Sequence, residues 1–210
     1  MLLSEGRGFL LVHVQRTAGT SLKAALAGAC PDAQEILGTH DWAAAARAHL
    51  GARYDALYRF ALVRNPWDRL VSWYEHIRQR GGAGGLEGPV EDGGINRLWR
   101  YALAHADSFR EFILRCDGVI DDVDGSKSFA FAQCAYVCDA QGRLIVDDVY
   151  RFEDLPAAAD RVFEKLQIDA RLPRLNPSRH RPYREYYDAQ TRAVVGRRFA
   201  PDIARFGYEF

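Results

Sequence analysis

The chain has 210 residues, of which 48% are hydrophobic and 27% are charged, and we therefore expect a single compact domain over residues 1–210. The 28 Lys and Arg residues balance the 28 Asp and Glu residues, so the net charge gives no indication of a nucleic-acid partner. The apolar stretch near the N-terminus is far shorter than the ~20 residues of a membrane-spanning helix, and the four cysteines show no C-x-x-C spacing. These features favour a cytoplasmic protein with reduced thiols and no integral membrane segment.

The first element is a nearly continuous apolar run from Phe9 to Val14, which predicts a buried central strand. A polar loop, residues 15–21, follows this strand. Apolar residues then recur at helical spacing from Leu22 to Ala29. The chain therefore begins with a strand, a polar loop and a helix.

A second unit of the same kind follows. Residues 59–63 form another apolar run that is typical of a buried strand. The signals of a helix start come next, because Asn65 is a good N-cap and Pro66 suits the first helical position. Asp68 adds a carboxylate to the first turn, which favours the positive end of the helix.

The middle of the chain begins with a glycine-rich segment, residues 81–94, that cannot hold regular structure. This segment is either a surface loop or a lid over an acceptor site. A helical stretch is expected over residues 95–115. Residues 134–139 and 144–146 flank a turn and predict a hairpin.

The last third of the chain predicts a core strand over residues 148–152, a helix over 156–166 and a C-terminal helix from about Asp188, which Pro201 should kink or restart. Strands that alternate with helices predict an α/β fold with three layers (α/β/α) around a central, mostly parallel sheet, as in P-loop NTPases. Ligands of such folds bind at the carboxyl ends of the strands. The polar loop at residues 15–21 and the turn that follows the strand at 59–63 both lie there.

The first loop has the composition of an anion cradle. Gly19 allows close approach of the backbone, Thr20 and Ser21 offer hydroxyl donors, and Arg16 brings a positive charge. The alternative is an ordinary turn capped by Thr20. The loop lacks the G-x-x-x-x-G-K-[ST] pattern, which argues against an Mg–ATP site.

The second loop begins at Arg64, whose guanidinium can hold a phosphate bidentately, and Ser72 follows two turns later with a hydroxyl. The alternative makes Arg64 an ion-pair partner of Asp68 and Ser72 a neutral surface residue.

These two loops carry a resemblance to a known family. Residues 14–22 resemble the 5′-phosphosulfate loop of sulfotransferases, and residues 60–74 resemble their 3′-phosphate motif nearly residue for residue. Further similarities lie at 38–40, 149–155, 183–187 and 202–208. The chain is similar to the carbohydrate-type branch, which includes heparan-sulfate 2-O-sulfotransferases and many bacterial members.

The resemblance implies that the cofactor is PAPS (3′-phosphoadenosine 5′-phosphosulfate; product PAP), with no metal. Arg64 and Ser72 would hold its 3′-phosphate, and Ser178 and Arg179 of the late basic loop would close over it. His40 would be the catalytic base in an in-line displacement. The residues implied to hold the 5′-phosphosulfate are Arg16, Thr17, Ala18, Gly19, Thr20 and Ser21.

One departure from the family concerns Arg16, because relatives usually carry Lys there, after a residue that is often Pro and here is Gln15. The acceptor implied is a hydroxyl of a carbohydrate or glycolipid. Three tryptophans, Trp42, Trp73 and Trp99, either stack on sugar faces or pack in the interior. The alternatives are a small-molecule or nucleotide kinase on a P-loop-like fold, and a PAP-binding module without catalysis. The sequence does not indicate the oligomeric state.

Overall fold

The computed structural model describes residues 1–81, 96–122, 125–173 and 180–210. The chain packs as two compact units, Met1–Arg64 with Gln133–Pro177, and Asn65–Ala132 with Ser178–Phe210. The expectation that these units together make one domain stays a prediction.

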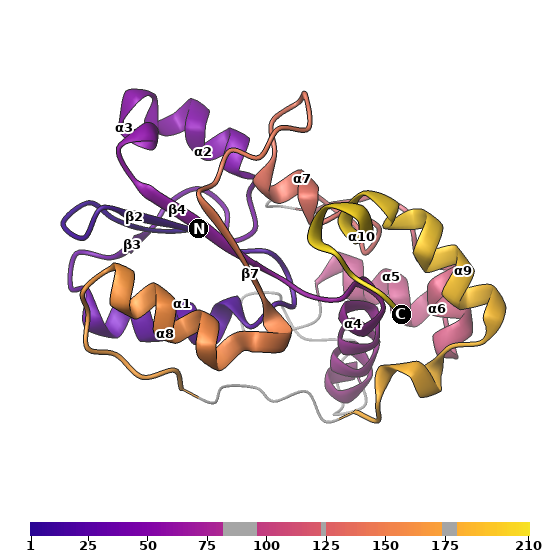
Figure 1. Cartoon of the computed structure of the whole chain (residues 1–210). Coiled ribbons are helices and arrows are strands. Elements are labelled where there is room, and N and C mark those ends of the chain that lie inside the picture. Colours follow the sequence, from indigo (N-terminus) through magenta and orange to yellow (C-terminus); the bar gives the residue numbers. More distant parts are fainter. Residues whose placement is uncertain (82–95, 123–124, 174–179) are drawn as a thin grey trace. The chain divides into compact units, whose positions relative to one another are not determined.

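The first unit contains a five-stranded sheet (Figure 1). Strand β2 pairs in parallel with β4, and β4 pairs in parallel with β7, whereas β1 is antiparallel to both β2 and β3. Four of the five strands therefore run in one direction, and the predicted mostly parallel sheet is confirmed. In sheet order the strands are β3 (Gln34–Glu35), β1 (Leu2–Ser4), β2 (Phe9–Val12), β4 (Tyr58–Val63) and β7 (Asp148–Arg151).

Helices cover both faces of this sheet, as predicted. Figure 1 shows α1 (Gly19–Ala29) and α8 (Leu155–Lys165) on one face, and α2 (Ala43–Leu50) and α3 (Ala52–Asp55) on the other. On the face covered by α1 and α8, the inward-pointing side chains of the strands pack against the apolar stripes of the two helices. Together they form one continuous core. Its members include Phe9, Leu11, Phe60, Leu62, Leu22, Leu26, Val162 and Phe163.

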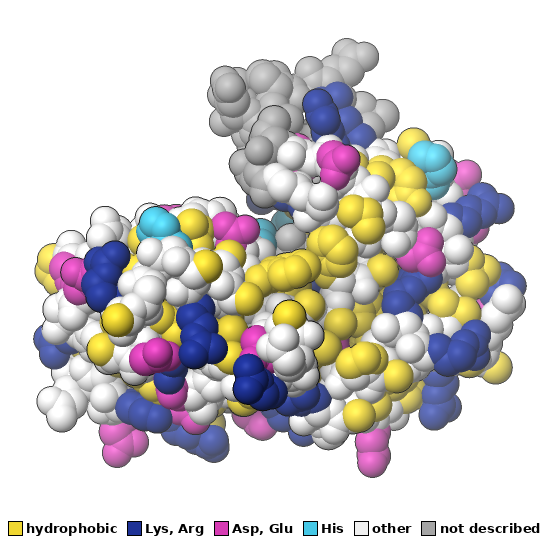
Figure 2. Space-filling view, turned by 90° about the horizontal axis from the view of Figure 1, so that it is seen from above, with side chains coloured by type: hydrophobic (Ala, Val, Ile, Leu, Met, Phe, Trp, Pro, Cys, Tyr) yellow, Lys and Arg dark blue, Asp and Glu magenta, His cyan; other side chains and the backbone are white. Residues whose placement is uncertain are grey.

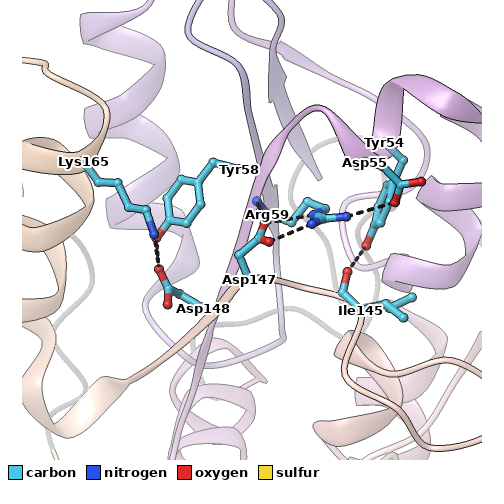
Figure 3. A network of polar contacts seen from close by, with 8 residues as sticks. All are labelled: Tyr54, Asp55, Tyr58, Arg59, Ile145, Asp147, Asp148 and Lys165. Carbon is cyan, nitrogen blue, oxygen red and sulfur yellow. Dashed lines mark hydrogen bonds and ion pairs between the residues drawn. The ribbon is translucent and has the colours of Figure 1, made fainter.

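Polar side chains gather at the amino ends of β4 and β7 (Figure 3). The guanidinium of Arg59 makes a bidentate ion pair with Asp147, with Nη2–Oδ1 at 2.7 Å and Nε–Oδ2 at 2.9 Å. Asp55 accepts a third bond from Arg59 at 3.2 Å. Because Arg59 binds its carboxylate, the pKa of Asp147 is lowered.

A neighbouring group of side chains at the same end surrounds Asp148. Its carboxylate accepts hydrogen bonds from the Tyr58 hydroxyl at 2.6 Å and from Lys165 Nζ at 2.8 Å. Lys165 Nζ also lies 4.1 Å from the centroid of the Tyr58 ring. Burial and the bond to Asp148 raise the pKa of Tyr58, so its hydroxyl is a donor. These contacts tie β4, β7 and α8 together.

The second unit is mainly helical, and its core contains Trp67, Trp73, Phe112, Phe129 and Phe199. A two-stranded hairpin, β5 (Ile120–Asp122) with β6 (Gly125–Lys127), accompanies the helices. The helices are α4 (Pro66–Gly81), α5 (Arg97–His105), α6 (Phe109–Arg115), α9 (Ala189–Arg198) and α10 (Ala200–Phe206), with a 3₁₀ turn, η3 (Tyr183–Tyr186).

The helix starts predicted from local sequence are confirmed. Asn65 Oδ1 accepts a hydrogen bond from the backbone N–H of Trp67 at 3.1 Å, which is the expected N-cap of α4. Asp188 forms a capping box with Thr191 at the start of α9. The chain restarts as α10 with Pro201 in its first turn.

Two predicted elements were wrong. The helical stretch over residues 95–115 is broken after His105, because the Ser108 hydroxyl caps a new helix by accepting from the N–H of Glu111 at 3.2 Å. The first arm of the predicted hairpin is instead a short helix, α7 (Cys134–Val137), which leaves only an isolated bridge between Cys138 and Leu144. The candidate lid, residues 81–94, lies outside the described residues except for Gly81.

The surface carries both signs of charge. Figure 2 shows Lys and Arg side chains interspersed with Asp and Glu over the visible face, in keeping with their equal numbers. Among the helices of the described ranges, none is long and apolar enough to cross a membrane.

Candidate active site

The loop that leads into α1, residues 15–18, has a backbone suited to binding an anion and is called the anion loop below. Arg16 and Ala18 adopt left-handed conformations, with φ of 63° and 62°, while Thr17 between them does not. Such alternation turns successive N–H groups toward one concave side, as in phosphate-binding nests. The positive end of the helix dipole of α1 adds to the attraction.

The hydroxyl groups of this loop differ in their contacts. Thr17 is buried, and its Oγ1 donates to the carbonyl of Val14 at 2.9 Å, so this side chain shapes the loop. Thr20 is exposed and does not cap the helix, because Ala18 occupies the N-cap position and makes no side-chain cap bond. The alternative of a turn capped by Thr20 is therefore wrong. Ser21 lies buried in the first turn of α1.

Gly19 is required by a close neighbour. A Cβ at this position would lie well inside van der Waals distance of Cδ2 and Nε2 of His13, and 2.9 Å from its Cγ. The imidazole of His13 therefore occupies the space beside the first residue of α1. The sequence suggested that Gly19 allows a close approach to the backbone. In the first unit, the group that approaches Gly19 closely is the side chain of His13, just after the end of β2.

His40 lies beside the same imidazole. The ring centroids of His13 and His40 are 4.5 Å apart, with an angle of 58° between the planes. His40 Nδ1 lies 3.0 Å from the backbone carbonyl oxygen of His13. Because a carbonyl oxygen only accepts, Nδ1 carries the proton, and the lone pair of the neutral ring lies on Nε2.

Backbone contacts hold the segment that carries His40. The N–H of Gly38 donates to Asp41 Oδ2 at 2.6 Å, and the nitrogen of Met1 lies 3.1 Å from the Gly38 carbonyl. Leu37 adopts a left-handed backbone, with φ of 56°. Three of the four non-glycine residues with positive φ in the described chain thus lie in this segment or in the anion loop. Such strain persists only where the surroundings enforce it, and it concentrates at functional sites.

His13 is a neutral imidazole. Its side chain is only 6% exposed, and burial, followed by the nearby His40, holds its pKa well below the ordinary value. The imidazole of His13, which lies beside the ring of His40, is therefore uncharged at physiological pH.

Arg64 follows the end of β4 and points its side chain toward the anion loop. Its Nη1 lies 3.4 Å from the backbone oxygen of Arg16, and its Cζ lies 4.0 Å from the centroid of the Phe152 ring. The amide of Gln133 binds both backbone groups of Arg64: Oε1 accepts from its N–H at 2.8 Å, and Nε2 donates to its carbonyl at 2.7 Å. The first unit therefore places Arg64, the first residue of the second predicted loop, beside the backbone of the first loop.

The remaining predicted site residues lie elsewhere. Ser72 is fully buried on α4, so the alternative of a neutral surface residue is wrong. It belongs to the second unit, and its predicted pairing with Arg64 stays a prediction. Ser178 and Arg179 lie outside the described residues. Within the described chain, no group of His, Cys, Asp or Glu side chains is arranged to hold a metal ion.

Sequence reasoning missed three residues of this site, His13, Gln133 and Phe152. No local pattern marks Gln133, which reaches Arg64 from a distant part of the chain. Phe152 lies in the family-like segment 149–155, but nothing in that segment indicates its contact with Arg64. His13 had a weak signal, since an imidazole stands two residues before the polar loop, near the end of an apolar run.

Comparison with family models matches residues 1–209 to the sulfotransferase family. Comparisons with curated proteins and with solved structures gave no match. The match spans nearly the whole chain and includes both loops that meet at Arg64. Members of this family are enzymes that transfer a sulfuryl group to an acceptor. The chain belongs to the sulfotransferase family.

Proposed function

We propose that this enzyme transfers the sulfuryl group of PAPS to a hydroxyl of a carbohydrate or glycolipid, with His40 as the general base. The observation that carries the proposal is the hydrogen bond from His40 Nδ1 to the His13 carbonyl, beside the anion loop. This bond fixes the tautomer that leaves Nε2 as the proton acceptor. A base and an anion cradle are the two parts that group transfer to a hydroxyl requires.

The residues of the first unit fit a nucleotide with anionic groups at both ends. The concave N–H groups of residues 16–19 and the charge of Arg16 suit a 5′-phosphosulfate. The fork of donors on Arg64 suits a phosphate, and its plane is held by the ring of Phe152. When bound, PAPS supplies an activated sulfuryl group. The assignment of the 3′-phosphate to Arg64 and Ser72 rests on the sequence resemblance.

The protein's own groups then have separate tasks. His40 Nε2 accepts the proton of the acceptor hydroxyl, and a neutral His13 beside it offers no like charge against the imidazolium that forms. Arg16 and the N–H groups of the loop stabilise the negative charge that develops in the cradle.

The replacement of the usual Lys by Arg16 is compatible with this division of tasks. A guanidinium keeps its charge and offers five N–H donors, but it does not give up a proton. Arg16 would therefore stabilise the departing oxygen by charge and hydrogen bonding rather than by protonating it.

A carbohydrate acceptor is supported by one aromatic residue. Trp42 follows His40 closely in the chain and is 44% exposed, and its ring and that of Tyr136 make a T-shaped contact with centroids 6.4 Å apart. Exposed indole rings present a flat apolar face that suits the C–H face of a sugar. Trp73, in contrast, is buried in the core of the second unit.

Calorimetric titration of the full chain with PAP, ADP and ATP–Mg²⁺ tests the cofactor. We expect tight binding of PAP alone, followed by transfer of ³⁵S from labelled PAPS to sugar acceptors. Preference for ATP–Mg²⁺ would favour a kinase and refute the proposal. Binding of PAP without transfer to any of a broad panel of hydroxyl acceptors would identify a PAP-binding module instead.

A further inference from the structure

The imidazole of His13 lies between two functional parts of the first unit. One side of it faces the ring of His40, with centroids 4.5 Å apart. Another side fills the space where a Cβ of Gly19 would lie. The ring therefore connects the base to the first residue of helix α1, where the anion loop ends.

The backbone of the same residue adds a second contact. The carbonyl oxygen of His13 accepts the Nδ1 proton of His40 at 3.0 Å. One residue thus determines both which nitrogen of His40 carries the proton and which way the ring faces. A hydrogen bond alone leaves rotation about its axis free, and the packed ring of His13 opposes that rotation.

The Nδ1 nitrogen of His13 does not explain the presence of a histidine here. Nδ1 is buried and has no hydrogen-bond partner among the described residues. A buried donor or acceptor without a partner is destabilising, so Nδ1 gives no reason for a histidine at this position. The contacts of the ring are those of a flat and uncharged surface that packs against His40 and the first residue of α1.

We propose that His13 is a positioning residue for the base: its carbonyl fixes the tautomer of His40, and its flat ring fixes the orientation of the His40 imidazole relative to the anion loop. This inference rests on the proposed function of His40. It assigns His13 no contact with the acceptor or the nucleotide.

Two variants separate shape from nitrogen chemistry. His13→Phe keeps a flat ring of similar size, whereas His13→Ala removes it. We expect His13→Ala to lower kcat about 10²-fold, the loss typical of a misplaced catalytic group, with the Kd for PAP unchanged. His13→Phe should keep kcat within a few-fold of wild type. Should His13→Ala fail to fold, His13→Leu, which keeps volume without a flat ring, replaces it.

A second measurement does not depend on activity. ¹⁵N NMR of labelled histidine reports the tautomer of His40 directly. We expect the Nδ1–H form in wild type and in both variants, because each keeps the backbone carbonyl of residue 13. A mixture of tautomers in wild type would overturn the role of the carbonyl, and wild-type kcat in His13→Ala would overturn the role of the ring. So would a loss in His13→Phe equal to that in His13→Ala, because it would assign the function to a ring nitrogen.

The two proposals fail in different ways. If wild type transfers no sulfuryl group, the proposed function is wrong, while the tautomer of His40 in wild type still decides whether the carbonyl of His13 holds it. If wild type is active and His13→Ala keeps its kcat, the positioning role of the ring alone is wrong.

Discussion

Gly19→Ala tests the packing around His13 most directly. The added methyl would overlap Cδ2 and Nε2 of His13 and would lie 2.9 Å from Cγ, whereas carbon atoms pack at about 3.5–4.0 Å. The ring is buried, and His40 lies on another side of it, so it has little room to move. Overpacking of this kind typically costs about 1–3 kcal/mol. We therefore expect a lower free energy of unfolding, with a fall in Tm of about 2–4 °C per kcal/mol for a chain of this size.

Gly28→Ala is the matched control, because it places the same methyl on the same helix with nothing within 4 Å. The higher helix propensity of alanine should stabilise this variant by up to about 1 kcal/mol. Urea unfolding of both variants at equal protein concentration gives the comparison.

The double variant His13→Ala/Gly19→Ala completes the test. With the imidazole removed, the methyl at position 19 has space, so its cost should largely disappear, and the two substitutions should be strongly non-additive. A Gly19→Ala protein as stable as wild type would refute the contact. Full additivity with His13→Ala would show that the methyl is resisted by something other than this ring.

Arg64→Ala should weaken binding of PAP by about 1.5–3 kcal/mol, the scale of a hydrogen bond to a charged group, while barely changing binding of 5′-AMP; calorimetry that finds equal losses would discredit the 3′-phosphate assignment. His40→Ala should abolish ³⁵S transfer and leave the Kd for PAP unchanged, and an active variant would require another base. Arg59 holds the pKa of Asp147 below its ordinary 3.8, so their pair contributes stability that is complete above pH 3.8 and is lost as the pH falls through the lower folded-state pKa. Asp147→Asn should therefore flatten the acid side of a pH profile of unfolding; an unchanged profile would show that the pair contributes nothing measurable, as surface pairs often do.

Local signals predicted the frame of the fold well. The strand ending at Val63 and the helix beginning at Pro66 could be recognised because the N-cap bond of Asn65 Oδ1 is made to the next turn of the chain. Pro201 marked the restart of the last helix for the same reason, since its effect is confined to its own backbone. Where structure depends on neighbours a few residues away, the sequence was sufficient.

Contacts between distant segments could not be predicted in this way. The side-chain amide of Gln133 takes the place of a neighbouring strand for Arg64, across 69 residues of sequence. The apolar residues around it suggested a hairpin, yet the chain forms the short helix α7 there. A run of four residues fits either form, and tertiary packing decides between them.

The candidate site was predicted in part. The two candidate anion-binding loops could be identified from their composition and from the family resemblance, and the structure places Arg64 beside the backbone oxygen of Arg16. The tautomer of His40 could not be predicted, because it depends on a carbonyl 27 residues earlier in the chain. His13 belongs to the apolar run that predicts a buried strand, and its 6% exposure agrees with that burial, but its contact with His40 could not be predicted.

The two ends of strand β4 differ in a way that matters for engineering. Arg59 near its start belongs to a network of ion pairs, and Arg64 after its end reaches the anion loop. At about 3.3 Å per residue, roughly 16 Å of extended chain separates the two. Substitutions that far apart usually have additive effects. Stabilising substitutions could therefore be sought at the amino end of the sheet, among the ion pairs around Asp147 and Asp148. Their effects should add to those of substitutions made near Arg64 and the anion loop.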